Sequence, residues 1–295
     1  MELMTREYNK GRFNSFNQKD HIYFRDSLPK DKEPLSQLIL IHGAVEHMGR
    51  HHRLLKFLES QFQDSIITQM DLKGHGLSGG GRSHIESFEE FSSDVVALIN
   101  REMPWDKHIQ KRIVLGHSLG GLVVLDTFLN HADKVEKSID GLILSNPCIK
   151  PALDVPQGSE TLLKASSRFL SKIRLPSLYK GEDLTNDLDL AEDFDLDPLI
   201  PKFMTIGLMN EIMEKTKEIR AKSYFLNYPC LFLFSGQDKL VDNDIGELFA
   251  RGMAQEYKSV VNFPSAKHEL FNEVSDIREQ SFKEIKHWLK SQGIV

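Results

Sequence analysis

The sequence predicts an α/β fold, in which a mainly parallel sheet is covered by helices on both faces. Short, continuously apolar runs such as residues 141–145 alternate with longer segments whose apolar residues recur every three or four positions. Runs buried on both faces are typical of parallel strands, whose crossover connections are usually helices. Residues 148–228 interrupt this alternation without a convincing buried strand, so we expect a helical cap inserted between two strands.

The expected elements follow one another in a regular order. Weak alternation at 12–16 and 21–25, around a polar turn, predicts a β-hairpin. Apolar runs then predict buried strands at 35–43, 65–70, 112–115, 141–145, 230–236 and 259–263. Helical periodicity predicts helices at 54–62, 87–98, 122–132, 244–254 and 276–290. Ser87 and Glu90 have the spacing of a capping box at the start of the second of these helices.

The interrupting block has a composition of its own. It contains five prolines, and its segments 160–173 and 203–219 are helix-like and rich in Leu, Ile, Phe and Met. We interpret it as a cap over the ends of the sheet. The expected organisation is a first part of the core at 1–147, a cap at 148–228 and a second part of the core at 229–295.

The composition excludes several classes of protein. The net charge of −6 and the pI near 6.1 argue against a nucleic-acid partner, because phosphate binding needs a basic face. Only two cysteines occur, so a disulfide framework is not expected and a reducing compartment fits. No apolar run near the start resembles a signal peptide, and no window approaches the roughly 20 residues of a membrane span. We therefore expect a soluble, cytoplasmic protein.

Two serines match the pattern Gly-x-Ser-x-Gly, and their surroundings separate them. Ser118, in the stretch GHSLGG at 116–121, lies between a short apolar run and an apolar helix. Small neighbours permit the sharp strand-to-helix turn that exposes a nucleophilic hydroxyl, although a phosphate-binding turn has a similar pattern. Ser78 is followed by more glycine-rich loop and by no helix, so we expect it to be a flexible turn residue.

A serine hydroxyl needs a general base, which a third group must orient. Asp238 and His268 follow the last two predicted buried strands, and strand-end loops are where such sheets place their chemistry. Of the twelve histidines, only His268 has this place in the chain. Asp242 and Asp244 are alternatives to Asp238, but they fit capping of the next helix better.

An ester hydrolase also needs amide donors for the developing oxyanion. In the loop HGAVEH, after the first buried strand, Gly43 lets the backbone turn so that the Ala44 amide could face the site. The Leu119 amide, directly after Ser118, would be the second donor. Glycine turns also occur in many loops without a catalytic role, so the loop taken by itself leaves this assignment open.

At these residues the sequence resembles the α/β-hydrolases of the monoacylglycerol lipase and lysophospholipase family. HGAVEHMGRH resembles the oxyanion-loop pattern His-Gly-x-x-Glu-His-x-Gly-Arg-Tyr, with His51 in place of the usual aromatic residue. MDLKGHGLSGG resembles a structural loop of the family, which identifies Ser78 as a decoy. GHSLGG, SGQDKLVD and KHELFNE resemble the segments of the nucleophile, the acid and the base, and LTNDLDLAEDFDLDPL resembles part of the cap.

The resemblance extends over nearly the whole chain and implies an α/β-hydrolase fold. It implies that Ser118, Asp238 and His268 form a catalytic triad and that the Ala44 and Leu119 amides form the oxyanion hole. Substrate identity is carried over least, because the cap is where such relatives differ most.

The cap is the expected place of substrate recognition. A long acyl chain would need an apolar tunnel, and the candidate lining residues are Leu163, Phe169, Leu170, Phe203, Ile206 and Met209. A small cap cannot bury this much apolar surface within itself, and mobile Met- and Leu-rich helices would suit a lid that contacts a lipid surface. Residues 182–197 carry eight Asp or Glu and no Lys or Arg; at the pocket rim they would disfavour anionic head groups, although such a stretch is usually a solvated loop.

The sequence therefore predicts a serine hydrolase, free of metal and cofactor, that cleaves carboxylic esters of monoacyl lipids through an acyl-enzyme. The substrate would be a monoacylglycerol or a lysophospholipid. A generalist short-chain carboxylesterase is the alternative among enzymes, and a shallow pocket would favour it. A non-catalytic binding module of the same fold is the alternative from another class; it would be expected to lack Ser118, Asp238 or His268, and all are present.

Overall fold

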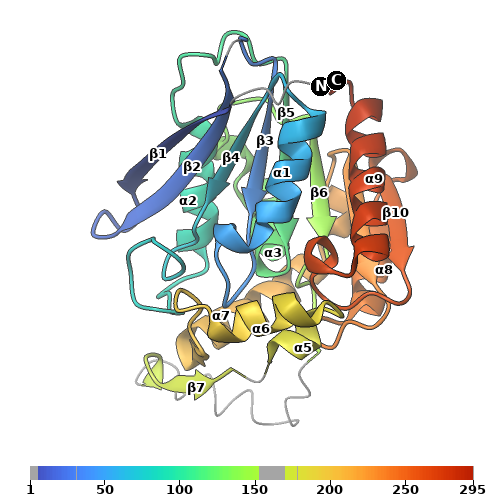
Figure 1. The fold of residues 1–295 in the computed structure, drawn as a ribbon. Helices are drawn as coiled ribbons and strands as arrows, with labels where there is room; N and C mark the ends of the chain where they lie inside the picture. The colour runs from blue at the N-terminus through green and yellow to red at the C-terminus, as the bar shows by residue number, and fades with distance from the viewer. Residues whose placement is uncertain (1–5, 31, 153–169, 178, 295) are drawn as a thin grey trace.

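An eight-stranded sheet forms the centre of the molecule (Figure 1). The computed structural model describes residues 6–30, 32–152, 170–177 and 179–294. The strands of the sheet, in their spatial order, are β1 (Arg6–Asn14), β2 (His21–Pro29), β4 (Ser65–Met70), β3 (Ser36–Ile41), β5 (Lys111–His117), β6 (Gly141–Ser145), β9 (Cys230–Ser235) and β10 (Lys258–Phe263). Pairing is parallel from β4 to β10 and antiparallel only at β1–β2 and β2–β4, which confirms the predicted mainly parallel sheet.

The register of the parallel strands brings their carboxyl ends to one edge of the sheet. Ile41, which ends β3, pairs with Gly116 near the end of β5. Ser235 and Phe263, which end β9 and β10, pair with each other. The loops that follow these strands therefore meet at the same edge, where sheets of this kind bind their ligands.

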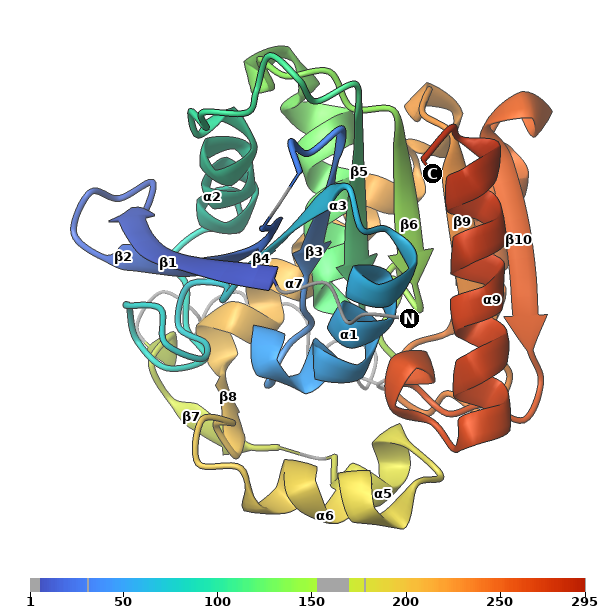
Figure 2. The ribbon, with the colours of Figure 1, turned by 45° about the horizontal axis from the view of Figure 1, so that its top comes forward.

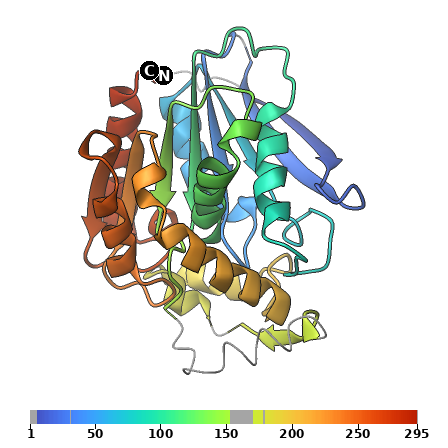
Figure 3. The same cartoon turned by 180° about the vertical axis from the view of Figure 1, so that it is seen from behind.

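Helices cover both faces of the sheet, as Figures 1 and 3 show. On one face α1 (His52–Gln61) and α9 (Ser275–Ser291) pack over one hydrophobic core. On the other face α2 (Glu89–Asn100), α3 (Leu119–Asn130) and α8 (Asn243–Gly252) pack over a second. Every residue of β3, β6 and β9 is buried as a result, which explains their mainly apolar sequences.

The insertion between β6 and β9 adds no strand to the main sheet within its described residues. It contains α5 (Gly181–Leu184), α6 (Leu188–Leu196) and α7 (Ile206–Arg220), and a small sheet of β7 (Arg174–Pro176) and β8 (Phe203–Thr205). Figure 2 shows β7, β8, α5 and α6 beyond the carboxyl ends of the strands. The helix expected at 203–219 begins at Ile206, because the residues before it pair with β7. The predicted segment 160–173 is described only from Leu170, and the division of the chain at 148 and 228 stays a prediction.

The amino-terminal hairpin is confirmed, and both of its strands are longer than expected. The predicted capping box is wrong, because α2 begins at Glu89 and has no side-chain hydrogen bond at its N-cap, Phe88. Glu90 instead accepts a hydrogen bond of 2.5 Å from the ammonium of Lys73, a residue that is only 4% exposed. A buried cation without a counterion costs more free energy than a helix start without a second cap. Glu90 therefore points toward Lys73.

Asp94 of α2 holds the turn of the hairpin. Its carboxylate accepts hydrogen bonds from the Ser15 hydroxyl at 2.9 Å and the Phe16 amide at 2.8 Å, and it is fully buried. Burial raises the pKa of Asp94 to about 7, although the two donors act in the opposite direction. The neutral acid is therefore favoured by folding, and the stability that it contributes is lost as the pH rises from about 4 to about 7.

The substitution Asp94→Asn tests this linkage. Asparagine keeps the shape and can bond both partners, but it carries no charge to desolvate. The variant should gain stability relative to the wild type by up to about 1.4 kcal/mol per pH unit between about pH 4 and pH 7. Chemical unfolding across this range measures the difference, and two curves that run parallel would show that Asp94 is already ionised in the folded protein.

Candidate active site

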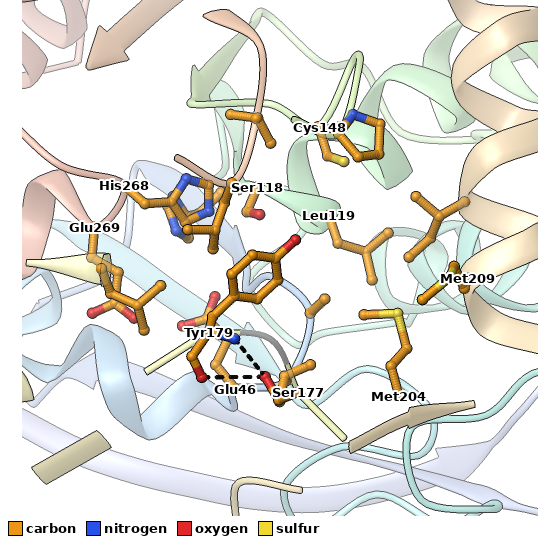
Figure 4. A pocket seen from close by; sticks show the side chains of 18 of the residues that line it. Glu46, Ser118, Leu119, Cys148, Ser177, Tyr179, Met204, Met209, His268 and Glu269 are labelled. Carbon is orange, nitrogen blue, oxygen red and sulfur yellow. Dashed lines mark hydrogen bonds between the residues drawn. The ribbon is translucent and has the colours of Figure 1, made fainter. Parts of the chain in front are cut away.

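Ser118 lies on the turn between β5 and α3 with a strained backbone. Its φ of 53° is in a region that residues other than glycine rarely adopt. Its amide donates to Ser145 O at 3.0 Å, and its carbonyl accepts from the amides of Leu122 and Cys148 at 3.2 and 2.9 Å. The main chain on both sides of Ser118 is thus fixed, and its side chain lines a pocket (Figure 4).

Glycines permit this turn because the strand and the helix approach each other closely. A Cβ on Gly116 would lie 2.5 Å from the Gly120 carbonyl oxygen, and a Cβ on Gly120 would lie 2.3 Å from the Ile41 oxygen. Both contacts are with backbone, which cannot yield without displacing β3 or α3. The glycines that mark Ser118 in the sequence are therefore required by packing.

Asp238 and His268 form a buried pair in the loops after β9 and β10. His268 Nδ1 lies 2.6 Å from Asp238 Oδ2, and the two side chains are 3% and 1% exposed. The other carboxylate oxygen accepts from the amides of Leu240 and Val241 at 2.8 and 3.1 Å. His268 lines the same pocket as Ser118, although no hydrogen bond joins the hydroxyl to the ring among the described residues.

The charges of this pair are set by their proximity. Burial would lower the pKa of His268, but the Asp238 carboxylate outweighs burial and the pKa is raised above its ordinary value. Burial would raise the pKa of Asp238, but His268 and the two amides keep it below its ordinary value. The carboxylate therefore stays ionised near neutral pH and binds the Nδ1 proton, which leaves Nε2 available to take up a second proton.

The loop after β3 lies directly against the serine. A Cβ on Gly43 would be 2.9 Å from the Ser118 Cβ, so no larger residue fits there. Ala44 and Leu119 line the pocket, and within the described chain neither of their amides has a hydrogen-bond partner. Two unpartnered N–H groups beside one hydroxyl are what stabilisation of an oxyanion requires.

The pocket that contains Ser118 has an empty volume of about 780 Å³ (Figure 4). Its apolar wall combines residues of the sheet edge and of the insertion, among them Leu119, Leu184, Phe194, Met204, Met209 and Ile212. Its polar lining includes Glu46, Ser177, Tyr179, His268 and Glu269. An apolar chamber with a few polar groups at one reactive hydroxyl suits an amphiphilic small molecule.

The candidate substrate residues of the insertion occupy different places. Met209 of α7 lines the pocket. Ile206 is buried, Phe203 packs under Arg174 with the guanidinium 4.5 Å from its ring centre, and Leu170 is 41% exposed; none of the three lines this pocket. Leu163 and Phe169 lie outside the described residues. A role in substrate binding stays a prediction for the whole set.

Ser78 is a structural residue, but a buried one rather than a flexible one. Its hydroxyl donates to Asp71 O at 2.6 Å and accepts from the Tyr23 amide at 2.8 Å, which ties the glycine-rich loop to β2. No flexible turn residue would be held in this way. Asp242 is the N-cap of α8, as its place in the sequence suggested, and its side chain accepts from the Ile245 amide at 3.2 Å.

Asn146 is a site residue that sequence reasoning missed. It follows β6 with a φ of 42°, and its side-chain amide donates to Ser235 Oγ at 2.8 Å and to His268 O at 2.6 Å. Its oxygen accepts from the Ser235 amide at 2.8 Å. Asn146 thus connects β6, β9 and the histidine loop. Its position directly after a buried strand was the available signal.

The described chain offers no site for a metal ion: among residues 6–30, 32–152, 170–177 and 179–294 no three His, Cys, Asp or Glu side chains form such a group.

A helix that crosses a lipid bilayer needs roughly 20 consecutive, mainly apolar residues. Within the described residues, every helix is too short or too polar to cross one.

The fold and the strained serine at the sheet edge define the class of protein, the α/β-hydrolases. A family model described as "Serine aminopeptidase, S33" matches residues 32–275, so the chain belongs to this family. The fold and the family inferred from the sequence motifs are thereby confirmed.

Curated relatives and solved structures agree with this assignment. "Phospholipase YtpA" of Bacillus subtilis is 28% identical over 255 residues, which cover 86% of this chain and 95% of the relative. "Monoglyceride lipase" of Homo sapiens is 25% identical over 264 residues, 88% of this chain and 84% of the relative. A soluble variant of monoglyceride lipase from Saccharomyces cerevisiae, solved with a substrate analog, superimposes with a TM-score of 0.79 at 20% identity and covers 99% of this chain and 98% of its own; it shows the fold alone.

Proposed function

We propose that this protein is a carboxylic ester hydrolase that cleaves monoacyl lipids through an acyl-enzyme on Ser118. The observation that carries the proposal is the apolar pocket of about 780 Å³ in which Ser118 and His268 both lie. Its lining is mainly apolar with a few polar groups near Ser118, which suits one acyl chain. The relatives named as phospholipase and monoglyceride lipase support the same class of substrate.

The proposed reaction would use Ser118, His268 and Asp238 with two backbone amides. His268 Nε2 takes the proton of Ser118, and the alkoxide attacks the ester carbonyl while the Ala44 and Leu119 amides bind the oxyanion. His268 then protonates the departing alcohol, and a water molecule activated by the same ring releases the fatty acid. Asp238 holds the ring in the required tautomer and stabilises its cation. The Ser118–His268 hydrogen bond would form with substrate, since such bonds are often loose in empty sites.

The pocket favours an ester over a peptide with a free amino terminus. A charged amino terminus would need an uncompensated carboxylate, and the pocket contains Glu46 and Glu269. Glu269 pairs with Arg50 at 2.5 Å and Glu46 pairs with His51 at 3.2 Å. Both carboxylates are therefore neutralised from within the protein, which leaves the pocket suited to uncharged groups.

Turnover of defined lipids by wild type and Ser118→Ala tests the function. The wild type should release oleate from monooleoylglycerol and from lysophosphatidylcholine faster than from the anionic lysophosphatidate. The variant should lose about 10⁴-fold or more in kcat on each. Turnover of short soluble esters only would favour the generalist carboxylesterase instead, and activity that survives in Ser118→Ala would identify another nucleophile.

Met209→Trp tests whether the acyl chain lies along α7. The indole would fill the pocket beside Met209, so kcat/KM for an oleoyl ester should fall by about tenfold or more, equivalent to roughly 1.4 kcal/mol. A butyryl ester should lose less than about twofold, because it would not reach this wall. Met209→Leu, which conserves volume, is the matched control and should lower oleoyl turnover far less. Equal losses on both esters would place the chain elsewhere.

The proposal includes peripheral contact of the insertion with a lipid surface. Ile173 and Leu170 are 44% and 41% exposed beside Lys172, whose side chain is 79% exposed. Apolar side chains with a neighbouring cation are typical of interfacial contact. Ile173→Asp should lower the fraction that sediments with anionic phospholipid vesicles while hydrolysis of a soluble ester continues. An unchanged bound fraction would exclude this contact.

A further inference from the structure

A buried acid–base pair joins Glu46 of the loop after β3 to His51, and neither residue has been given a catalytic role above. Glu46 and His51 are 3% and 4% exposed, and Glu46 Oε2 lies 3.2 Å from His51 Nε2. Neither ring nitrogen of His51 has an aligned hydrogen-bond partner among the described residues, so the attraction is one between charges. Both ionisable groups are thus shielded from water and lie close to each other.

Glu46 acts directly on the loop that presents the Ala44 amide. Its Oε1 accepts a hydrogen bond from the Gly43 amide. A Cβ on Gly43 would lie 2.7 Å from Oε1 and 2.9 Å from the Ser118 Cβ, so Gly43 is held between the carboxylate and the serine. Val45, two residues on, has a positive φ of 55°. The position of the Glu46 carboxylate therefore sets the distance of this loop from Ser118.

His51 is the group that forms an ion pair with this carboxylate among the ionisable residues described around it. Burial lowers the pKa of His42 to about 4 and that of His117 to about 3, so both rings are neutral. Arg50, which lies with His51 in the 3-10 helix Met48–His51, is paired with Glu269 at 2.5 Å. These groups, with His268 beyond the ring of His117, are the charged and titratable neighbours of the pair.

We propose that His51 is a positioning residue for the oxyanion loop: its cationic ring compensates Glu46, which holds Gly43 and so keeps the Ala44 amide against Ser118. The inference rests on the esterase function proposed above. The cation has a second effect, because an uncompensated carboxylate in the pocket would repel the negative charge that develops on the substrate oxygen.

The geometry makes kcat dependent on the charge of His51. Burial would lower the pKa of His51, but Glu46 raises it above the ordinary value. The compensation is therefore complete below this pKa and is lost as the pH rises through it. The kcat profile should have an acid limb, where His268 must lose its proton to act as a base, and an alkaline limb, where His51 loses its own.

Charge variants of His51 test the inference on a short soluble ester and on monooleoylglycerol. His51→Gln keeps a polar side chain but no charge, so Glu46 would ionise without a partner as the pH rises. His51→Lys restores a cation with a higher pKa. The alkaline limb should move to lower pH in His51→Gln and to higher pH in His51→Lys. At about pH 8 the glutamine variant should lose about tenfold or more in kcat with KM changed less than about twofold.

Two further variants keep the test specific. His52→Gln replaces the neighbouring histidine, which is exposed, and should leave the limb where it is in the wild type. The double variant Glu46→Gln, His51→Gln removes both charges and should have no alkaline limb from this source. Active sites are counted in each variant by titration with a fluorophosphonate, so that misfolded protein does not enter kcat.

The possible outcomes distinguish failure of this inference from failure of the proposed function. An alkaline limb that stays in place in His51→Gln, or a loss confined to KM or to the number of titratable sites, would overturn the inference and leave the esterase intact. Opposite shifts in the glutamine and lysine variants support it, because a purely structural histidine would not give them. A wild type that hydrolyses neither ester would overturn the proposed function, and the inference with it.

Discussion

The close approach of β5 and α3 is the constraint on which the rest of the site depends. A Cβ on Gly120 would be 2.3 Å from the Ile41 oxygen, so the first turn of the helix lies almost on the backbone of β3. The chain can enter the helix at this distance only through a positive φ at Ser118, a strain of roughly 1–3 kcal/mol. The same contact brings the loop after β3 against the serine. One packing requirement thus places both the hydroxyl and the Ala44 amide.

The charged groups around this turn are compensated in buried pairs. Arg50 binds Glu269, the residue after His268, and also donates to Leu190 O of the insertion at 3.2 Å. The guanidinium therefore connects three segments that are far apart in the sequence. Removing one member of a buried pair typically costs about 3–5 kcal/mol, because the other charge is left without a partner. Such pairs specify how the loops dock more than they add net stability.

Much of the fold and of the candidate site could be predicted because these features depend on local sequence. Strands buried on both faces are mainly apolar, and residues that follow their carboxyl ends share one edge, which is why Ser118, Asp238 and His268 stood out. The features that the sequence did not predict depend on tertiary contacts. Glu90 had the spacing of a capping residue, but the position of Lys73 decides its direction. Asn146 follows a buried strand, but its partners, Ser235 and the His268 carbonyl, come from distant segments. Glu46 and His51 lie close together in the sequence, and the folded loop is needed to show that they form a buried pair.

The distribution of charge on the insertion separates its outer surface from the pocket. Of its acidic stretch, Asp183, Asp187 and Asp197 pair with Lys239, Arg53 and His47 at 3.4, 3.1 and 2.9 Å. The other acidic residues are exposed: Glu182, Asp189, Glu192, Asp193 and Asp195. Their field extends over about one Debye length, near 8 Å at physiological salt, and would disfavour anionic groups near this surface. The carboxylates within the pocket are neutralised by Arg50 and His51, so under the proposed function the uncompensated negative charge lies on the outside of the insertion and not beside Ser118.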